Sequence, residues 1–178
     1  MTYKLGDVMI SREKIAARLK ELAAEIAKDY EKDNTVTFVG ILTGAAVFLT
    51  DLIREMPEDM DVKMDFMSIA SYGEGTTSSG VVRIYHDLKK SIEGKHIIVV
   101  EDIVDTGLTL SHLLGILQAR NPASLKVCVL LDKYERRKTE VKVDYCGFKI
   151  PDKFVVGYGL DCSSKWRHLK DIKSVIEE

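Results

Sequence analysis

Apolar residues near the start of the chain recur with the period of a helix. They stand at spacings of four, three and four residues, which puts them on one face. Ser11, just before this stripe, is a suitable N-cap residue. The pattern therefore predicts an amphipathic helix that packs on a core through Ile15, Leu19, Leu22 and Ile26.

Further along the chain, short apolar or alternating runs predict strands, and stretches with helical spacing separate several of them. The predicted strands are residues 36–42, 62–70, 81–87, 97–100 and 125–131. Residues 47–56 and a leucine stripe over residues 110–117 predict helices. Strands that alternate with helices indicate an α/β fold with a mostly parallel, doubly wound sheet and flanking helices.

The stretch 96–110 reads H-I-I-V-V-E-D-I-V-D-T-G-L-T-L. Its wholly apolar run 97–100 predicts a strand that is buried on both faces. Glu101 and Asp102 follow directly, where we expect the strand to reach its carboxyl end. Two adjacent carboxylates at this position suit vicinal hydroxyls and a divalent cation.

The D-T-G-L-T sequence at 105–109 connects this strand to the next helix. Backbone N–H groups and hydroxyls in such a turn can hold a phosphate, and a ribose 5-phosphate combines phosphate with vicinal hydroxyls. A simple turn with Asp105 or Thr106 as N-cap is the alternative. The D-x-D-x-T spacing of aspartyl-phosphate hydrolases and the Walker sequence are both absent from the chain.

Two other segments join predicted elements through small residues. L-T-G-A-A at 42–46 forms a second turn between a strand and a helix, and a simple tight connection is the alternative. Residues 71–80 contain three glycines and four Ser or Thr residues besides Ser71. They predict either a long hairpin connection or a lid loop.

Composition narrows the class of protein. The chain has 178 residues, enough for one domain over 1–178 with a substantial core, and its net charge of −2 gives no basic surface for nucleic acid. No apolar run reaches membrane-spanning length, and the N-terminus lacks the layout of a signal peptide. We therefore expect a cytoplasmic protein without nucleic-acid or membrane partners. The three cysteines are widely spaced, so we expect reduced thiols, two of them packed as small hydrophobic residues.

Two motifs together resemble one enzyme family. V-V-E-D-I-V-D-T-G-L-T at 99–109 resembles the phosphoribosyl-diphosphate (PRPP) signature of type I phosphoribosyltransferases. P-D-K-F-V-V-G-Y-G at 151–159, followed by L-D and W-R-H-L, resembles the purine-recognising segment of hypoxanthine-guanine phosphoribosyltransferases. The resemblance extends over essentially the whole chain. It implies the type I phosphoribosyltransferase fold, with a flexible lid loop at 71–80, a PRPP loop at 101–109 and a small hood from the chain ends, mainly 150–178.

The resemblance also implies a reaction. A 5-phosphoribosyl group passes from PRPP to hypoxanthine or guanine, giving IMP or GMP and pyrophosphate, with Mg²⁺ as cofactor. This is a purine salvage activity, and members of the family are usually homodimers or homotetramers.

This chain departs from the family pattern at two positions. Many members carry Lys or Arg where this chain has Thr43, and Tyr where it has Cys162.

Residue roles follow from the resemblance only. Asp105 is expected to act as general base at purine N7. The predicted contacts to PRPP and its phosphates come from Glu101, Asp102, Thr106, Gly107, Leu108, Thr109, Leu42, Thr43, Gly44 and Arg167. The predicted purine contacts come from Lys133 at the 6-oxo group, Phe154 by stacking and the Val155 backbone. The predicted metal ligands are Glu101, Asp102 and Asp161, and the lid begins with Ser71 and Tyr72. The family also often has a cis peptide where this chain has Leu42 and Thr43.

Three alternatives stay open at this stage. A phosphoribosyltransferase-like regulator would bind PRPP and nucleic acid without catalysis, but the acidic charge and the short N-terminal segment do not favour it. An enzyme for pyrimidines or adenine is opposed by Lys133 and by the segment 151–159. Asp161 and Arg167 would form a plain surface ion pair if neither contacts a ligand.

Overall fold

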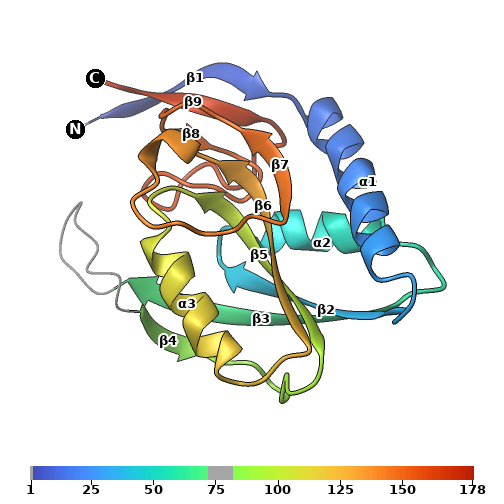
Figure 1. Cartoon of the computed structure of the whole chain (residues 1–178). Helices are drawn as coiled ribbons and strands as arrows, with labels where there is room; N and C mark the ends of the chain where they lie inside the picture. Colours follow the sequence, from blue (N-terminus) through green and yellow to red (C-terminus); the bar gives the residue numbers. More distant parts are fainter. Residues whose placement is uncertain (1, 72–81) are drawn as a thin grey trace.

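The structure is a computed structural model that describes residues 2–71 and 82–178 (Figure 1). Six strands form the main sheet in the order β4-β3-β2-β5-β6-β7. They are β2 (Thr35–Leu42), β3 (Asp61–Ser71), β4 (Val82–His86), β5 (His96–Val104), β6 (Ser124–Asp132) and β7 (Tyr145–Lys149). The edge strand β4 runs antiparallel to β3, and the other pairs are parallel, which confirms the predicted fold class.

Helices cover both faces of this sheet. Helices α1 (Arg12–Asp29) and α2 (Ala46–Arg54) pack on one face, and α3 (Leu108–Gln118) packs on the other (Figure 1). Strand β5 alternates between the two cores, because Ile98 and Val100 face α1 and α2 whereas Ile97 and Val99 face α3. This double burial explains the wholly apolar run in the sequence.

The first predicted helix has the expected cap. Ser11 is the N-cap of α1, and its side chain accepts a hydrogen bond from the Lys14 backbone N–H. The predicted stripe is buried, with Leu22 and Ile26 fully enclosed. Cys128 and Cys162 are also buried, as expected for thiols that pack as small hydrophobic residues.

The two chain ends form a second, antiparallel sheet in the order β1-β9-β8 (Figure 1). Its strands are β1 (Tyr3–Ile10), β8 (Val155–Val156) and β9 (Ile172–Glu177). A small segment from the chain ends therefore stands beside the main sheet, in agreement with the predicted fold class. The sequence pattern does not predict four strands, β1, β7, β8 and β9.

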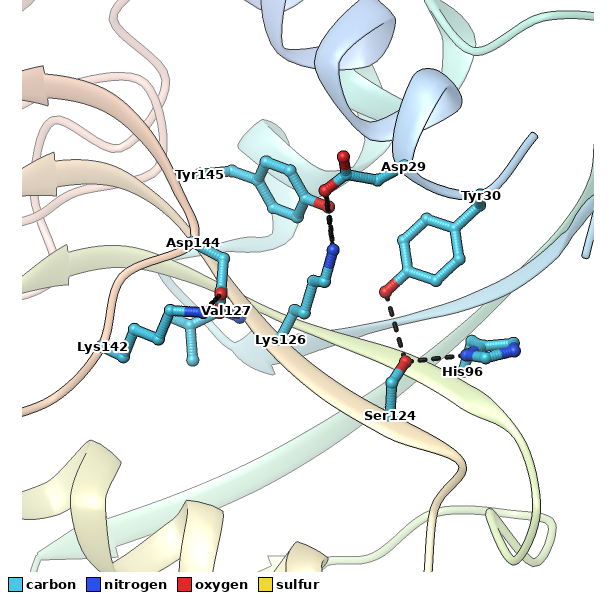
Figure 2. A network of polar contacts seen from close by, with 9 residues as sticks. All are labelled: Asp29, Tyr30, His96, Ser124, Lys126, Val127, Lys142, Asp144 and Tyr145. Carbon is cyan, nitrogen blue, oxygen red and sulfur yellow. Dashed lines mark hydrogen bonds and ion pairs between the residues drawn. The ribbon is translucent and has the colours of Figure 1, made fainter. Parts of the chain in front are cut away.

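A polar network ties the end of α1 to the amino-terminal ends of the central strands (Figure 2). Lys126 Nζ donates to Asp29 Oδ2 at 2.6 Å, and the Tyr145 hydroxyl donates to the same oxygen at 2.6 Å. Nearby, the Ser124 hydroxyl lies 2.8 Å from His96 Nδ1. These residues come from α1, β5, β6 and β7. The network therefore fixes the helix at the amino-terminal ends of these strands, whereas the predicted site lies at their carboxyl ends.

No helix among residues 2–71 and 82–178 combines the length and the apolar character that crossing a bilayer requires.

Candidate active site

The turns after β2 and β5 lie side by side because these two strands are parallel neighbours in the sheet. The peptide bond between Leu42 and Thr43 is cis, as the resemblance implies. Gly44 follows, and a Cβ atom at this position would overlap with the Asp102 carboxylate. The turn 42–44 therefore lies directly against Asp102, and the two predicted anion-binding segments form one site.

Glu101 and Asp102 lie within β5, not after it, because the strand continues to Val104. Both side chains are partly buried. Desolvation raises the pKa of Asp102 to about 6, although its backbone hydrogen bonds, including one from the Ile103 N–H, and the positive charge of Arg167 oppose the rise. Desolvation, with the negative charge of Asp102, raises the pKa of Glu101 well above its ordinary range. Among the residues that the structure describes, the charge of Arg167 does not outweigh this desolvation, so the ionised form of both carboxylates is disfavoured.

The predicted phosphate turn precedes α3. Gly107, the N-cap residue of α3, has φ +81°, a left-handed conformation that a side chain disfavours, and the Thr106 hydroxyl accepts a hydrogen bond from the Leu108 N–H at 3.5 Å. Thr106 accepts hydrogen bonds at its carbonyl oxygen from the N–H groups of Lys138 and Thr139, at 2.9 and 3.2 Å. The first N–H groups of a helix have no intrahelical acceptor, so this turn presents donors where an anion is expected.

One carboxylate oxygen of Asp105 is buried and accepts no hydrogen bond from the described residues. This oxygen, Oδ1, lies 3.1 Å from Arg136 Nε without accepting a hydrogen bond from it. A buried polar atom in this condition calls for a physical explanation, such as a ligand N–H. The prediction that Asp105 faces the purine supplies one.

Lys133 is the residue directly after β6, and its side chain is only 7 % exposed. Its Nζ atom lies 3.4 Å from Asp152 Oδ1. The Lys133 N–H donates to the carbonyl of Val104, next to Asp105, at 2.9 Å. The structure therefore brings the predicted base and the predicted purine donor to adjacent strand ends.

Phe154 lies at the start of the second sheet and is 53 % exposed. Its ring centroid is 6.4 Å from that of Tyr3, with an interplanar angle of 22°. Val155 is buried in β8, where it pairs with Ser174. Phe154 directly precedes β8, and its carbonyl accepts a hydrogen bond from the Val175 N–H of β9 at 2.9 Å, so its exposed ring is held where it can stack on a planar ligand.

Asp161 and Arg167 form an ion pair, with Arg167 Nη2 at 2.6 Å from Asp161 Oδ1. Arg167 Nη1 also donates to the Gly159 carbonyl at 2.6 Å, and the Ser164 N–H donates to Asp161 Oδ2 at 2.6 Å. Because a Cβ atom at Gly159 would overlap with the Gly44 carbonyl, this segment contacts the turn 42–44. The pair lies at the site, and both oxygens of Asp161 already have donors.

Residues 9–163 match the family model for the phosphoribosyl transferase domain. The chain belongs to the phosphoribosyltransferase family. It is 47 % identical to the hypoxanthine-guanine phosphoribosyltransferase of Dictyostelium discoideum, over 97 % of this chain and 96 % of that protein. It is 45 % identical to the enzyme of the same name from Bacillus subtilis, over 95 % of this chain and 92 % of that protein. The crystal structure of a hypoxanthine-guanine phosphoribosyltransferase from Bacillus anthracis superposes with a TM-score of 0.91, at 42 % identity, covering 99 % of this chain and 100 % of that one.

Two site features of this phosphoribosyltransferase were missed in the sequence. The run 135–138 looks like a solvated loop, but Arg136 contacts Asp105 and Asp152 from the short 3₁₀ helix η1 (Tyr134–Arg136). Arg137 pairs with Asp132, which is buried at the end of β6. Both arginines follow Lys133 closely, and that proximity was the available signal.

The predicted lid of the phosphoribosyltransferase, 71–80, lies outside the described residues apart from Ser71 at the end of β3. Tyr72 belongs to the part that is not described.

The close approach at Gly44 gives a first prediction. A methyl group there cannot fit beside the Asp102 carboxylate, so Gly44→Ala must displace either the turn or the carboxylate. We expect the KM for PRPP to rise about 10- to 100-fold, which corresponds to the roughly 1–3 kcal/mol that overpacking costs. Steady-state kinetics measure this, with Gly115→Ala on α3, where a Cβ meets nothing within 4 Å, as the control. Equal KM values for the two variants would contradict the close approach.

The buried carboxylates give a second prediction, for protein without metal. The pKa of Asp102 is about 6 in the fold, against about 3.9 in an unfolded chain. Its contribution to stability is fully present below the unfolded pKa and is lost as pH rises through about 6. The difference between these two pKa values corresponds to about 3 kcal/mol in the free energy of unfolding. Asp102→Asn should therefore be more stable than the parent at pH 8, and this advantage should shrink towards pH 4.5.

Urea unfolding at these two pH values, with a chelator present, measures the effect. A stability difference that is the same at both values would show that the Asp102 carboxylate is not desolvated in the fold.

Proposed function

We propose that this phosphoribosyltransferase transfers the 5-phosphoribosyl group of PRPP to hypoxanthine or guanine, giving IMP or GMP and pyrophosphate. The observation that carries the proposal is the meeting of Asp105 and Lys133 at adjacent strand ends. A 6-oxopurine offers an N–H group and a carbonyl oxygen on one edge, and these two side chains are the matching acceptor and donor. The family match and the names of the relatives agree with this reading.

The PRPP side of the site is formed by the turns after β2 and β5. We assign the ribose hydroxyls to Glu101 and Asp102. Residues 106–109 are assigned to the 5-phosphate, because their N–H groups lie at the start of α3. The turn 42–44 is assigned to pyrophosphate, mainly through backbone contacts.

Mg²⁺ suits the donor set at Glu101 and Asp102. Desolvation raises the pKa of both side chains, so a divalent cation would supply the missing counter-charge. No group of three potential ligands occurs among the described residues, but Mg²⁺ commonly uses one or two carboxylates together with substrate phosphates and water. When bound, it would neutralise charge on the departing pyrophosphate. The proposed role of Asp161 as a further ligand requires Arg167 to leave this carboxylate and turn to pyrophosphate.

The chain's own residues then act on the purine. The bond between ribose C1 and pyrophosphate breaks, and a bond from C1 to a purine ring nitrogen forms. Asp105 accepts the proton that the purine loses. Lys133 donates to the 6-oxo group, Phe154 stacks on the ring, and the Val155 backbone meets the pyrimidine edge.

A stoichiometric assay tests this proposal. Protein incubated with PRPP, hypoxanthine and Mg²⁺ should form IMP and pyrophosphate in equal amounts. Ribose 5-phosphate in place of PRPP should give no nucleotide, because it has no pyrophosphate to release. Absence of nucleotide with both hypoxanthine and guanine would contradict the proposed function.

Assembly and location remain predictions from the sequence. We propose a homodimer or homotetramer in the cytoplasm, in line with the family resemblance. Sedimentation analysis of the purified chain tests the first part, and a monomer at assay concentration would contradict it.

A further inference from the structure

One carboxylate beside the proposed purine site is shared by two cations. Lys133 Nζ lies 3.4 Å from Asp152 Oδ1, and Arg136 Nη1 lies 3.3 Å from the same oxygen. Arg136 Nε lies 3.1 Å from Asp105 Oδ1. The four side chains form a continuous series whose two ends, Lys133 and Asp105, are the groups assigned to the purine.

Backbone hydrogen bonds bring this series together. The Arg136 N–H donates to the Lys133 carbonyl at 3.1 Å within η1, and residues three apart on a 3₁₀ helix share one side. The Ile150 N–H donates to the Asp132 carbonyl at 3.0 Å, which holds the segment leading to Asp152 beside Lys133. The contacts therefore rest on the main chain at the ends of β6 and β7.

Lys133 and Asp152, which form one ion pair of this series, differ strongly in burial. The Lys133 side chain is 7 % exposed, whereas Asp152 is 48 % exposed and remains well solvated. Desolvation opposes ionisation of Asp152, but the hydrogen bond from Lys133 and the charge of Arg136 lower its pKa below the ordinary value. An ionised Asp152 is thus available to orient the buried ammonium group of Lys133.

We propose that Arg136 and Asp152 are positioning residues for the purine, which hold Asp105 and Lys133 at the separation that a 6-oxopurine requires. O6 and N7 of such a base lie on one edge, so their two protein partners must keep a fixed spacing. A guanidinium is a planar fork that can contact two carboxylates at once, whereas an ammonium is a point charge. Arg136 uses this fork between Asp105 and Asp152. The inference rests on the proposed function.

The test compares three substitutions in the full-length protein. Asp152→Asn removes the charge that orients Lys133, and Arg136→Lys keeps the charge but cannot reach both carboxylates. We expect each to lower kcat/KM for hypoxanthine about 10- to 100-fold, as small misplacements at a reacting centre do. Asp152→Glu should restore part of the loss. KM for PRPP should not change, and the preference for hypoxanthine over adenine should narrow in Asp152→Asn.

A matched control comes from a surface ion pair of the same type. Asp87 accepts from Arg120 at 2.7 and 2.9 Å, at the opposite edge of the sheet. Asp87→Asn should behave like the parent in every assay, and melting temperatures should show that all variants fold. Because Arg136 and Asp152 act through one series, the double variant Arg136→Lys/Asp152→Asn should lose little more than the worse single variant.

The outcomes separate the inference from the proposed function. Parent protein that fails to make nucleotide from hypoxanthine overturns the proposed function, and the inference falls with it. If the parent is active but Arg136→Lys equals it, the fork between two carboxylates is not needed and the inference is wrong. A loss that raises KM for PRPP as much as KM for hypoxanthine would also overturn it, because that pattern indicates general disturbance of the site.

Discussion

Replacing Asp105 with Asn should lower kcat by about 10²–10⁴, the usual worth of general acid–base catalysis. Asn keeps the shape of the side chain and can still form hydrogen bonds, but it cannot accept the purine proton. Oδ1 of Asp105 is a buried oxygen without an aligned donor among the described residues, and therefore stands ready for such a proton. Pre-steady-state and steady-state turnover with hypoxanthine measure the loss.

Binding of PRPP provides the control for this variant. Asp105 lies after the two carboxylates assigned to the ribose, so calorimetry with PRPP and Mg²⁺ should give nearly the same affinity for parent and variant. Unchanged kcat in Asp105→Asn would reassign the side chain to a structural role, such as the partner of Arg136.

The second large effect concerns the choice of purine. An ammonium group donates hydrogen bonds and accepts none, so Lys133 pairs with a 6-oxo group. Opposite the 6-amino group of adenine it would meet another donor, and because the side chain is 7 % exposed, water cannot readily satisfy either group. Rejection of a substrate that leaves buried polar groups unpaired can reach roughly 10⁴-fold. Adenine should accordingly be a very poor substrate.

Lys133→Met tests this reading of the lysine. Methionine has a similar length without charge, so it fits a buried position while removing the donor. The variant should use hypoxanthine less well and tolerate adenine better, which narrows the ratio of the two kcat/KM values. Parent protein that uses adenine as well as hypoxanthine, or a ratio that the substitution leaves unchanged, would show that Lys133 does not distinguish the purines.

The central strands and helices could be predicted because burial dictates their patterns. The run 97–100 is apolar throughout because β5 is covered on both faces, and the leucines of α3 recur because one side of that helix is buried. The continuation of β5 through Glu101 and Asp102 could not be predicted, since polar residues at a strand end look like the start of a loop.

The second sheet was harder to predict for a geometric reason. Strand β1 pairs with β9 through register shifts around Val8, and these irregularities remove the simple alternation that marks a strand. Its partner lies at the far end of the chain, so no local pattern connects the two. Strand β7 is five residues long and contains Gly147, which is a weak strand signal.

Contacts between distant parts of the chain were also the part of the site that the sequence could not predict. Motifs at 101–109 and 151–159 are local, and their residues could be named from the sequence. The contacts of Arg136 with Asp105 and Asp152 depend on which strand ends meet, and the parallel pairing of Asp132 with Lys149 brings them together. A charged run in the sequence does not reveal such partners.

The most direct test of the account is nucleotide formation from PRPP and Mg²⁺ with hypoxanthine, guanine, xanthine and adenine, assayed in parallel at equal concentrations. Rapid formation of IMP and GMP, with negligible product from adenine, is the expected result. Adenine turnover comparable to that of hypoxanthine, or no nucleotide from either hypoxanthine or guanine, would contradict it.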